Sequence, residues 1–434
     1  MTSAQAVATA GEARREHGFW PIFRVASGNF LEMYDFMVFG YFADAIGAAF
    51  FPAKDDFARL MLAFMTFGAG FLMRPLGAII LGAYADRAGR KAGLLLTLGL
   101  MAVGVLSLAI TPSYAMIGLA APLIVLAGRL LQGFSAGMEL GGVSVYLSEI
   151  APPGRKGFYV SWQSASQQVA VVTAAGVGLA LAHALGAAQM QAWGWRLPLL
   201  LGCLIAPVLF FMRRSMTETA AFEAQKHRPS LGEVGAALLA HWRTVGVGVM
   251  LVTMTTVSFY MITTYTPTFG TKVLHLSAQT AFVVTLWVGV SNLVWLPVMG
   301  AVSDRVGRKP LLYACTGLML LTAYPAMVWL TGAPSFGRML AVELWLSFLY
   351  ASYNGAMVVF LTEIIPVKLR ATGFSLAYSL AAALFGGFSP AIATGLIKIT
   401  GNHAMPGAWL SFAALAGLIA TLLAAKAKEE DEQG

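Results

Sequence analysis

The feature that most constrains the fold of this 434-residue chain is a ten-residue segment that occurs twice. The segment GAYADRAGRK at 82–91 returns in the second half as GAVSDRVGRK at 300–309, and each copy lies between two long apolar stretches. A second pair, EIAP at 149–152 and EIIP at 363–366, repeats at nearly the same offset. Two independent pairs at one spacing indicate that the chain consists of two related halves, an arrangement known among membrane proteins.

The composition places both halves in a membrane. Apolar residues make up 58% of the chain and charged residues 11%, which leaves too little polar surface for a water-soluble globule. The net charge of +8 is carried by short basic clusters between apolar runs, so we expect no nucleic-acid partner. The segment from Met1 to Arg15 lacks the apolar core of a signal peptide and is predicted to be a cytoplasmic tail.

Twelve apolar segments are long enough to cross a bilayer, which takes about 20 residues. The sequence therefore predicts an all-α polytopic membrane protein with twelve transmembrane helices in two six-helix bundles. The predicted spans are 22–50, 57–84, 92–111, 115–148, 158–185, 193–212, 244–270, 279–302, 310–331, 336–362, 372–397 and 404–425. The predicted domains are an N-terminal tail at 1–21, a first bundle at 22–213, a cytoplasmic linker at 214–243, a second bundle at 244–426 and a C-terminal tail at 427–434.

The basic residues predict which side of the membrane each loop faces. If the chain starts inside, 20 of the 28 Lys and Arg residues fall on the cytoplasmic side, where such residues are enriched. Both termini are therefore predicted to be cytoplasmic, with Arg74 and Arg129 left at membrane depth. The six basic residues predicted outside are Lys54, Arg59, Arg196, Lys272, Arg338 and Lys398.

No motif in the sequence supports an enzyme. A Walker loop, a Gly-x-Ser-x-Gly elbow and a cluster of zinc ligands are all missing from the sequence. We therefore expect no ATP-driven pumping or hydrolysis, no cofactor and no metal site.

The repeated decapeptide resembles the signature loop of the major facilitator superfamily, Gly-x-x-x-Asp-Arg-x-Gly-Arg-Lys, and the resemblance extends over nearly the whole chain. It implies twelve-helix secondary transporters in which this loop joins the second and third helices of each half. Its charges are then expected to hold the halves together on the cytoplasmic side in one state of the transport cycle. The alternative is that the basic residues only fix the topology. The candidate gating residues are Asp86, Arg87, Arg90, Asp304, Arg305 and Arg308.

Three polar residues follow one another at spacings of three in the first span. Asn29, Glu32 and Asp35 would lie along one helical face that turns toward a polar cavity. Two carboxylates one turn apart repel each other, a situation that favours proton binding. We therefore predict proton coupling for Glu32 and Asp35, the alternative being a structural pair with an arginine of a neighbouring helix.

The fourth span carries a polar stripe of Arg129, Gln132 and Glu139. The segment 129–137 resembles the fourth-helix motif of the same superfamily, Arg-x-x-Gln-Gly-x-x-x-Gly, whose arginine is associated with proton coupling or with an anionic substrate. A planar guanidinium binds a carboxylate through two hydrogen bonds. Arg129 is the predicted substrate anchor and Glu139 a further proton-coupling candidate, the alternative being an ion pair of Arg129 with Glu139 or Asp35.

Arg74 lies within the second span and precedes Pro75. A proline inside a helix frees a carbonyl one turn back, which the arginine could satisfy. Both a substrate-binding and a structural role for Arg74 are therefore open.

Amide, hydroxyl and aromatic side chains complete the expected binding surface. The fifth span has an unusually polar face that consists of Ser161, Gln163, Ser164, Ser166, Gln167 and Gln168. Amides and hydroxyls orient a polyfunctional ligand without adding charge, although single aromatic residues at such positions are most often packing residues. The predicted substrate-binding residues beyond Asn29, Arg74, Arg129 and Gln132 are Gln163, Gln167, Tyr260, Tyr265, Asn292, Tyr350, Tyr353, Asn354 and Tyr378.

Longer stretches narrow the resemblance to one branch. The segments 28–36, 71–77 and 131–142 look like the metabolite:proton symporters of bacteria, and 154–164 with 346–357 is similar to the citrate-proton symporters within that branch. One departure is Met33-Tyr34, where Gln-Phe is expected in the citrate carriers, and it leaves the choice of substrate open.

The resemblance implies import of a tricarboxylate, citrate or tricarballylate, with protons across the bacterial inner membrane. The alternatives are symport of a dicarboxylate, shikimate or a betaine, and a non-transporting sensor of the same fold. The expected partners are a small organic anion, protons and the lipid bilayer, and the expected functional unit is a monomer.

Overall fold

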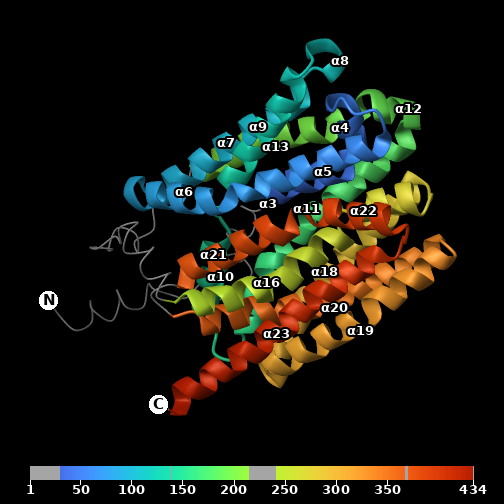
Figure 1. The fold of residues 1–434 in the computed structure, drawn as a ribbon. Coiled ribbons are helices and arrows are strands. Elements are labelled where there is room, and N and C mark those ends of the chain that lie inside the picture. The colour runs from blue at the N-terminus through green and yellow to red at the C-terminus, as the bar shows by residue number, and fades with distance from the viewer. Residues whose placement is uncertain (1–29, 138, 215–240, 367–369, 434) are drawn as a thin grey trace.

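The computed structural model describes residues 30–137, 139–214, 241–366 and 370–433, and this part of the chain contains helices and no strand (Figure 1). The predicted linker at 214–243 and the predicted tail at 1–21 lie mostly or wholly outside these residues. In Figure 1 the blue to green helices of the first half form one group, and the yellow to red helices of the second half form another beside it.

The helices of the first half form six rods, each of which is one long helix or two consecutive helices. The first, second and fourth rods are each interrupted by one or a few residues. The elements are α3 (Phe30–Tyr41), α4 (Ala43–Phe50), α5 (Asp56–Leu72), α6 (Arg74–Ala88), α7 (Arg90–Ile110), α8 (Tyr114–Ile117), α9 (Ala120–Ala136), α10 (Glu139–Ile150), α11 (Lys156–Ala184), α12 (Ala187–Gln189), η2 (Met190–Gly194) and α13 (Arg196–Arg214).

The second half repeats the plan with longer continuous helices. Its elements are α16 (Trp242–Ile262), α17 (Thr266–Thr268), η3 (Phe269–Val273), α18 (Ala278–Val306), α19 (Arg308–Gly332), α20 (Phe336–Ile364), α21 (Arg370–Ala381), η5 (Ala382–Gly386), α22 (Ser389–Thr400) and α23 (Met405–Gln433). Among the described residues, each of the twelve predicted spans therefore corresponds to one long helix or to a run of consecutive shorter helices.

The repeated decapeptide forms the same turn in both halves. Gly89 precedes α7 with a φ of 104°, and Gly307 precedes α19 with a φ of 97°. Side chains other than hydrogen are disfavoured at such angles, so glycine is required here. Three other helices begin at polar caps, since Asp55, Ser277 and Ser335 accept hydrogen bonds from the first turns of α5, α18 and α20.

The outer surface is suited to lipid. Among the described residues, nine helices are long and apolar enough to cross a membrane. Large apolar side chains on several helices point outward, with Val103 58% exposed, Leu204 72% and Leu321 71%. A soluble protein rarely exposes so much apolar surface, whereas a multi-pass membrane protein requires it.

Two spans differ from the prediction in their ends. The seventh was expected to run unbroken over 244–270, but α16 ends at Ile262 and the chain turns before α17. Pro267 lacks the N–H that a continuing helix needs and restricts the residue before it, which accounts for the break. The twelfth continues as α23 to Gln433 and includes residues 427–433 of the predicted tail, a stretch rich in good helix formers.

Glycines bring the second and fourth spans into close contact. A Cβ atom at Gly133 would lie 1.6 Å from the carbonyl oxygen of Gly70, and one at Gly77 would lie 1.9 Å from that of Phe134. Only glycine permits this approach of two backbones. The packing fixes α6 and α9 against each other and thereby places Arg74 and Arg129 in one layer.

Candidate functional site

Arg74 and Glu32 form an ion pair inside the first half. The Nη2 atom of Arg74 in α6 donates to Oε1 of Glu32 in α3 at 2.9 Å, and the two side chains are 3% and 5% exposed. The guanidinium carbon of Arg74 also lies 4.8 Å from the ring centre of Phe36 and 4.4 Å from that of Phe71. Aromatic faces attract a cation, so the pair is enclosed as well as neutralised.

Arg129 is completely buried in α9. Its Nη1 donates to Oε1 of Gln132 at 2.6 Å, and its guanidinium carbon lies 4.4 to 5.2 Å from the ring centres of Phe36, Phe39 and Phe67. Its Nε and Nη2 atoms have no hydrogen-bond acceptor among the described residues. Buried donors are nearly always satisfied in proteins, so these N–H groups identify a candidate site for an anion.

Asp35, three residues after Glu32 in α3, meets a different neighbour. Its Oδ1 atom packs against Gly202 of α13, where a Cβ atom would come within 2.6 Å. Both of its carboxyl oxygens lack a hydrogen-bond donor among the described residues, although the charge of Arg129 is close enough to act on it. The predicted common face of Glu32 and Asp35 is therefore split between two neighbours, because three residues advance a helix about 60° short of a full turn.

The buried charged residues of the first half, Glu32, Asp35, Arg74 and Arg129, form what we call the charged layer. Tyr260 of α16, in the second half, lies against this layer. Its ring lies edge-on to Phe67 at 5.9 Å and to Phe71 at 5.2 Å. The charges of Arg74, Arg129 and Glu32 all act on its hydroxyl group. The buried charges thus face the boundary between the halves and not lipid.

Two further predicted tyrosines join Tyr260. Tyr350 of α20 lies close enough to Tyr378 of α21 and to Tyr260 to interact electrostatically with both, and Tyr378 is likewise close to Tyr260. The hydroxyl of Tyr378 also lies near the side chain of Ser164 of α11, a residue of the first half. Hydroxyl groups from the second half therefore lie opposite the arginines of the first.

An amide chain crosses the same boundary. The Nδ2 atom of Asn292 in α18 donates to Oε1 of Gln168 in α11 at 3.2 Å, and Ser347 of α20 donates to Oδ1 of Asn292 at 2.8 Å. Gln163, one of the predicted residues of α11, accepts from Ser164 at 2.8 Å. Gln167, a second predicted residue of α11, is 9% exposed. The polar face predicted for the fifth span thus contacts the second half.

Three predicted residues of the second half have hydrogen-bond partners within that half. The Tyr353 hydroxyl donates to the Leu251 carbonyl at 2.9 Å, and the Tyr265 hydroxyl accepts from Thr394 at 3.2 Å. Asn354 accepts from Thr255 at 3.3 Å and donates to the hydroxyl of Tyr350, one of the site tyrosines, at 3.4 Å. Tyr353 and Asn354 are held by contacts within their own half, which is the packing role that single aromatic and amide residues often have.

Several predicted positions lie outside what the structure describes. Asn29 precedes the first described residue. The side chains of Glu139, Asp86, Arg87 and Arg90 are likewise outside the described part, although their helices are placed. Their predicted roles remain predictions.

The second decapeptide touches the first half through its aspartate. The backbone N–H groups of Gly157 and Phe158, at the start of α11, donate to the Asp304 carboxylate at 2.8 and 3.0 Å. Arg308 pairs with Asp304 at 2.8 Å and with Glu363 at 3.4 Å, while Arg305 is exposed. A carboxylate at a helix N-terminus is favourable because the first N–H groups of a helix are unpaired there.

We predict that Asp304→Asn loosens this end of the boundary between the halves. The change removes the charge at the N-terminus of α11 and weakens the contact by about 1 kcal/mol, or roughly fivefold in the closed population. Ser161 is buried below the contact, so a thiol placed there by Ser161→Cys should react faster with a maleimide in the Asp304→Asn background. Asp56→Asn, at an exposed carboxylate on the other side of the protein, should leave the rate unchanged, and equal rates in all three proteins would contradict the prediction.

The two halves also contact each other at the end of their boundary that lies away from Asp304. Lys272 of η3 pairs with Asp44 of α4 at 2.9 Å, and Phe282 of α18 packs against Tyr41 and Phe42 at 5.8 and 5.9 Å. Phe64 of α5 lies edge-on to Tyr265 at 5.9 Å. The charged layer is therefore covered by contacts between the halves on both sides.

Sequence reasoning missed three features of this arrangement. The pairing of Asp44 with Lys272 joins residues distant in sequence, which no local pattern indicates. Gln168 was not among the predicted site residues, although it occurs in the polar stretch of the fifth span. The carboxylate of Glu343 stands alone in an apolar run of the tenth span, and that isolation was a signal that could have identified it.

The fold and the buried polar layer define a secondary transporter, and the chain belongs to the Major Facilitator Superfamily, whose family model matches residues 25–379. It is therefore a multi-pass inner-membrane transporter and not an enzyme.

Comparison with known proteins shows which transporters of this family the chain resembles. The chain is 58% identical to the citrate-proton symporter of Salmonella typhi, over 93% of each chain, and 58% identical to that of Klebsiella pneumoniae, over 96% of this chain and 93% of the relative. Among solved structures it resembles a D-xylose-proton symporter with a TM-score of 0.75 at 20% identity, over 94% of this chain and 97% of that one. The last likeness concerns the fold alone.

Proposed function

We propose that this protein imports a tricarboxylate, citrate or tricarballylate, together with protons. The observation that carries the proposal is Arg129, a buried cation with two nitrogen atoms that lack acceptors among the described residues. A carboxylate of the substrate would accept from both, in the bidentate geometry that a guanidinium favours. The likeness to citrate-proton symporters over nearly the whole chain supports the same substrate class.

The tyrosine hydroxyls and the amide chain would bind the remaining polar groups of the substrate. Tyr260, Tyr350 and Tyr378 come from the second half, and Gln163 and Gln168 come from the first. A ligand held by both halves favours the state in which they close around it. Rocking of the two bundles about this layer then exposes the site to one side at a time.

Protons would enter through the carboxyl groups beside Arg129. Asp35 is buried, lacks a hydrogen-bond donor among the described residues and lies within the influence of the Arg129 charge. Proton binding at such a carboxyl removes the cost of burying its charge, and co-entry of protons offsets the charge of the anion. We infer that the contact of Asp304 with α11 closes the cytoplasmic side, that both termini are cytoplasmic and that the monomer is the transporting unit.

Uptake by the purified protein in liposomes tests the proposal. We expect labelled citrate to accumulate when the outside is more acidic than the inside and to stop accumulating when the gradient is collapsed. Unlabelled citrate, tricarballylate, malate, shikimate and betaine, added in turn, rank the substrates. Citrate uptake that ignores the gradient would rule out symport, and binding without flux would favour a sensor.

Asp35→Asn is predicted to separate substrate movement from the proton gradient. Each proton that moves down one pH unit supports about a tenfold accumulation of substrate. The variant should exchange labelled for unlabelled citrate across the membrane but should accumulate no more of it than wild-type protein without a gradient. Asp56→Asn, which alters an exposed carboxylate, is the matched control and should accumulate citrate normally. Normal gradient-driven accumulation by Asp35→Asn would exclude Asp35 as the coupling group.

A further inference from the structure

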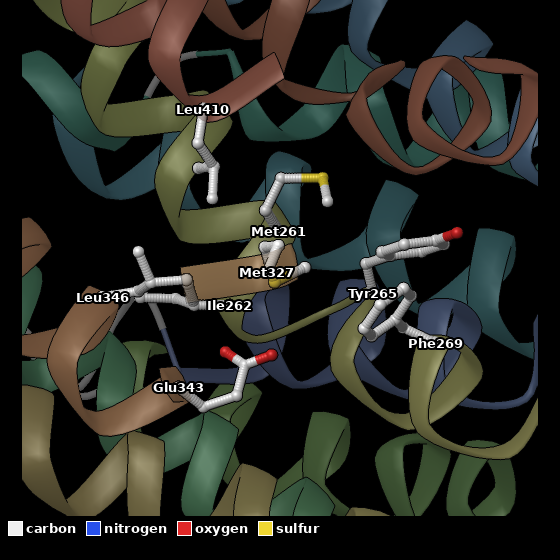
Figure 2. A pocket seen from close by; sticks show the side chains of 8 residues that line it. All are labelled: Met261, Ile262, Tyr265, Phe269, Met327, Glu343, Leu346 and Leu410. Carbon is white, nitrogen blue, oxygen red and sulfur yellow. The ribbon is translucent and has the colours of Figure 1, made fainter. Parts of the chain in front are cut away.

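Glu343 is a buried acid that the mechanism above does not use. It lies in α20 and is 3% exposed. Its Oε1 atom accepts a weak hydrogen bond from Thr266 Oγ1 at 3.4 Å, and its Oε2 atom has no hydrogen-bond partner among the described residues. Figure 2 shows its carboxyl group pointing into a small cavity inside the second half.

The cavity offers little to a charged carboxylate. Apart from Tyr265, whose hydroxyl contacts Thr394, the residues that line it with Glu343 are apolar. They come from the seventh span and its extension, from α19, from α20 and from α23. The apolar lining residues are Met261, Ile262, Phe269, Met327, Leu346 and Leu410.

The charged groups on the surrounding elements are directed elsewhere. Lys272 of η3 pairs with Asp44, and Arg338 of α20 donates to the Trp329 carbonyl at 2.8 Å. His275, beyond η3, is exposed. On α18 the charged residues are Asp304 and Arg305, at its opposite end. Arg243 lies in the first turn of α16, and Arg308 and Lys309 lie in the first turn of α19, where Arg308 pairs with Asp304 and Glu363. The charged residues of α23 begin at Lys426, far along the helix from Leu410. Among the described residues, no cation lies within salt-bridge distance of Glu343.

A carboxylate in this position would lose its hydration without gaining a counter-charge, which carries a large energetic cost. Binding of a proton to the carboxylate neutralises it and removes that cost, and the proton needs only one oxygen atom as its binding partner. A metal ion such as Ca²⁺ would need about six oxygen ligands, whereas the cavity offers one carboxyl and one hydroxyl group. We propose that Glu343 is a proton-binding site of the second half, separate from the acids around Arg129.

The contacts of Thr266 connect this site to the end of the boundary where Lys272 pairs with Asp44. Its hydroxyl reaches both Glu343 and, at 3.3 Å, the Met261 carbonyl, so it spans the break between α16 and α17. The residue before it, Tyr265, packs on Phe64 of the first half. Loss of the proton leaves a carboxylate that hydration stabilises. Glu343 is only 3% exposed in this structure, so we expect the broken segment to move when water reaches the carboxylate. Proton exchange at Glu343 therefore accompanies opening of the outer side, a step that rests on the proposed transport cycle.

Infrared spectroscopy of the purified protein tests the site without any substrate. A protonated carboxylic acid has its own carbonyl stretching band. We expect wild-type protein to lose such a band as the pH is raised, and Glu343→Gln to lack that component entirely. Glu343→Asp keeps a carboxyl group and should keep a titrating band. The exposed Asp56 is the matched control, so Asp56→Asn should leave the band unchanged.

An identical titrating band in wild type and Glu343→Gln would overturn the proposal. So would a Glu343 band that stays constant over the whole pH range in which the protein is folded. Citrate uptake measured on the same preparations keeps the two proposals apart. Absence of citrate uptake with a normal Glu343 titration would reject the transport function alone, and normal proton-driven uptake without the titration would reject the proton site alone.

Discussion

Replacing Arg129 by alanine is expected to lower the apparent affinity for citrate by at least about 100-fold, which abolishes uptake at ordinary concentrations. Hydrogen bonds to charged groups contribute about 1.5 to 3 kcal/mol each, and a loss of 1.4 kcal/mol is tenfold in affinity. Arg129 has two nitrogen atoms without acceptors among the described residues, so two such bonds to the substrate are at stake. Uptake and direct binding of labelled citrate by purified protein measure the effect.

Two further variants separate charge from geometry at this position. Arg129→Lys keeps the cation but not the planar pair of donors, so an intermediate loss is expected. Arg59→Ala removes a partly exposed arginine at the start of α5 and should leave affinity unchanged. If Arg129→Ala takes up citrate with wild-type affinity, the substrate anchor lies elsewhere.

Arg74→Ala is expected to destabilise the folded protein by about 3 to 5 kcal/mol, because it leaves the Glu32 carboxylate buried without its cation. The loss should appear as a lower midpoint of thermal or denaturant unfolding in detergent. The double variant Arg74→Met with Glu32→Gln removes both charges and should recover most of the stability. A double-mutant cycle with the two single variants gives the coupling energy of the pair.

The same double variant decides between the two roles of Arg74. If the arginine only neutralises Glu32, the stable double variant still binds citrate. If it also contacts the substrate, affinity is lost although stability returns. Additive effects of the two single variants on stability would show that the 2.9 Å contact contributes nothing.

Much of the fold follows from the sequence because its signals are local or repeated. The duplicated decapeptide predicts two related halves, and the same positive φ at Gly89 and Gly307 shows why its glycine recurs. The apolar runs predict the spans, and the family match confirms the fold class. The break after Ile262 was missed, because Pro267 ends the helix inside an otherwise apolar run.

The site was less predictable because its contacts join distant residues. The sequence placed Arg74 and Arg129 at membrane depth, and both are buried. It did not show that Glu32 pairs with Arg74 while Asp35 turns to Gly202, since a rotation of about 60° between them is enough to meet different neighbours. Nor could it show that the Tyr353 hydroxyl is satisfied within its own half by Leu251.

The bridge between Asp44 and Lys272 has a consequence for the cell's surroundings. The two side chains are 28% and 42% exposed, so dissolved ions reach them. Attraction between exposed charges weakens as salt shortens the screening distance, from about 30 Å at 0.01 M to about 8 Å at 0.15 M. With both termini cytoplasmic, as proposed above, this bridge lies on the external side. We then expect the salinity of the external medium to affect how readily that side of the carrier opens, with dilute water keeping it shut for longer.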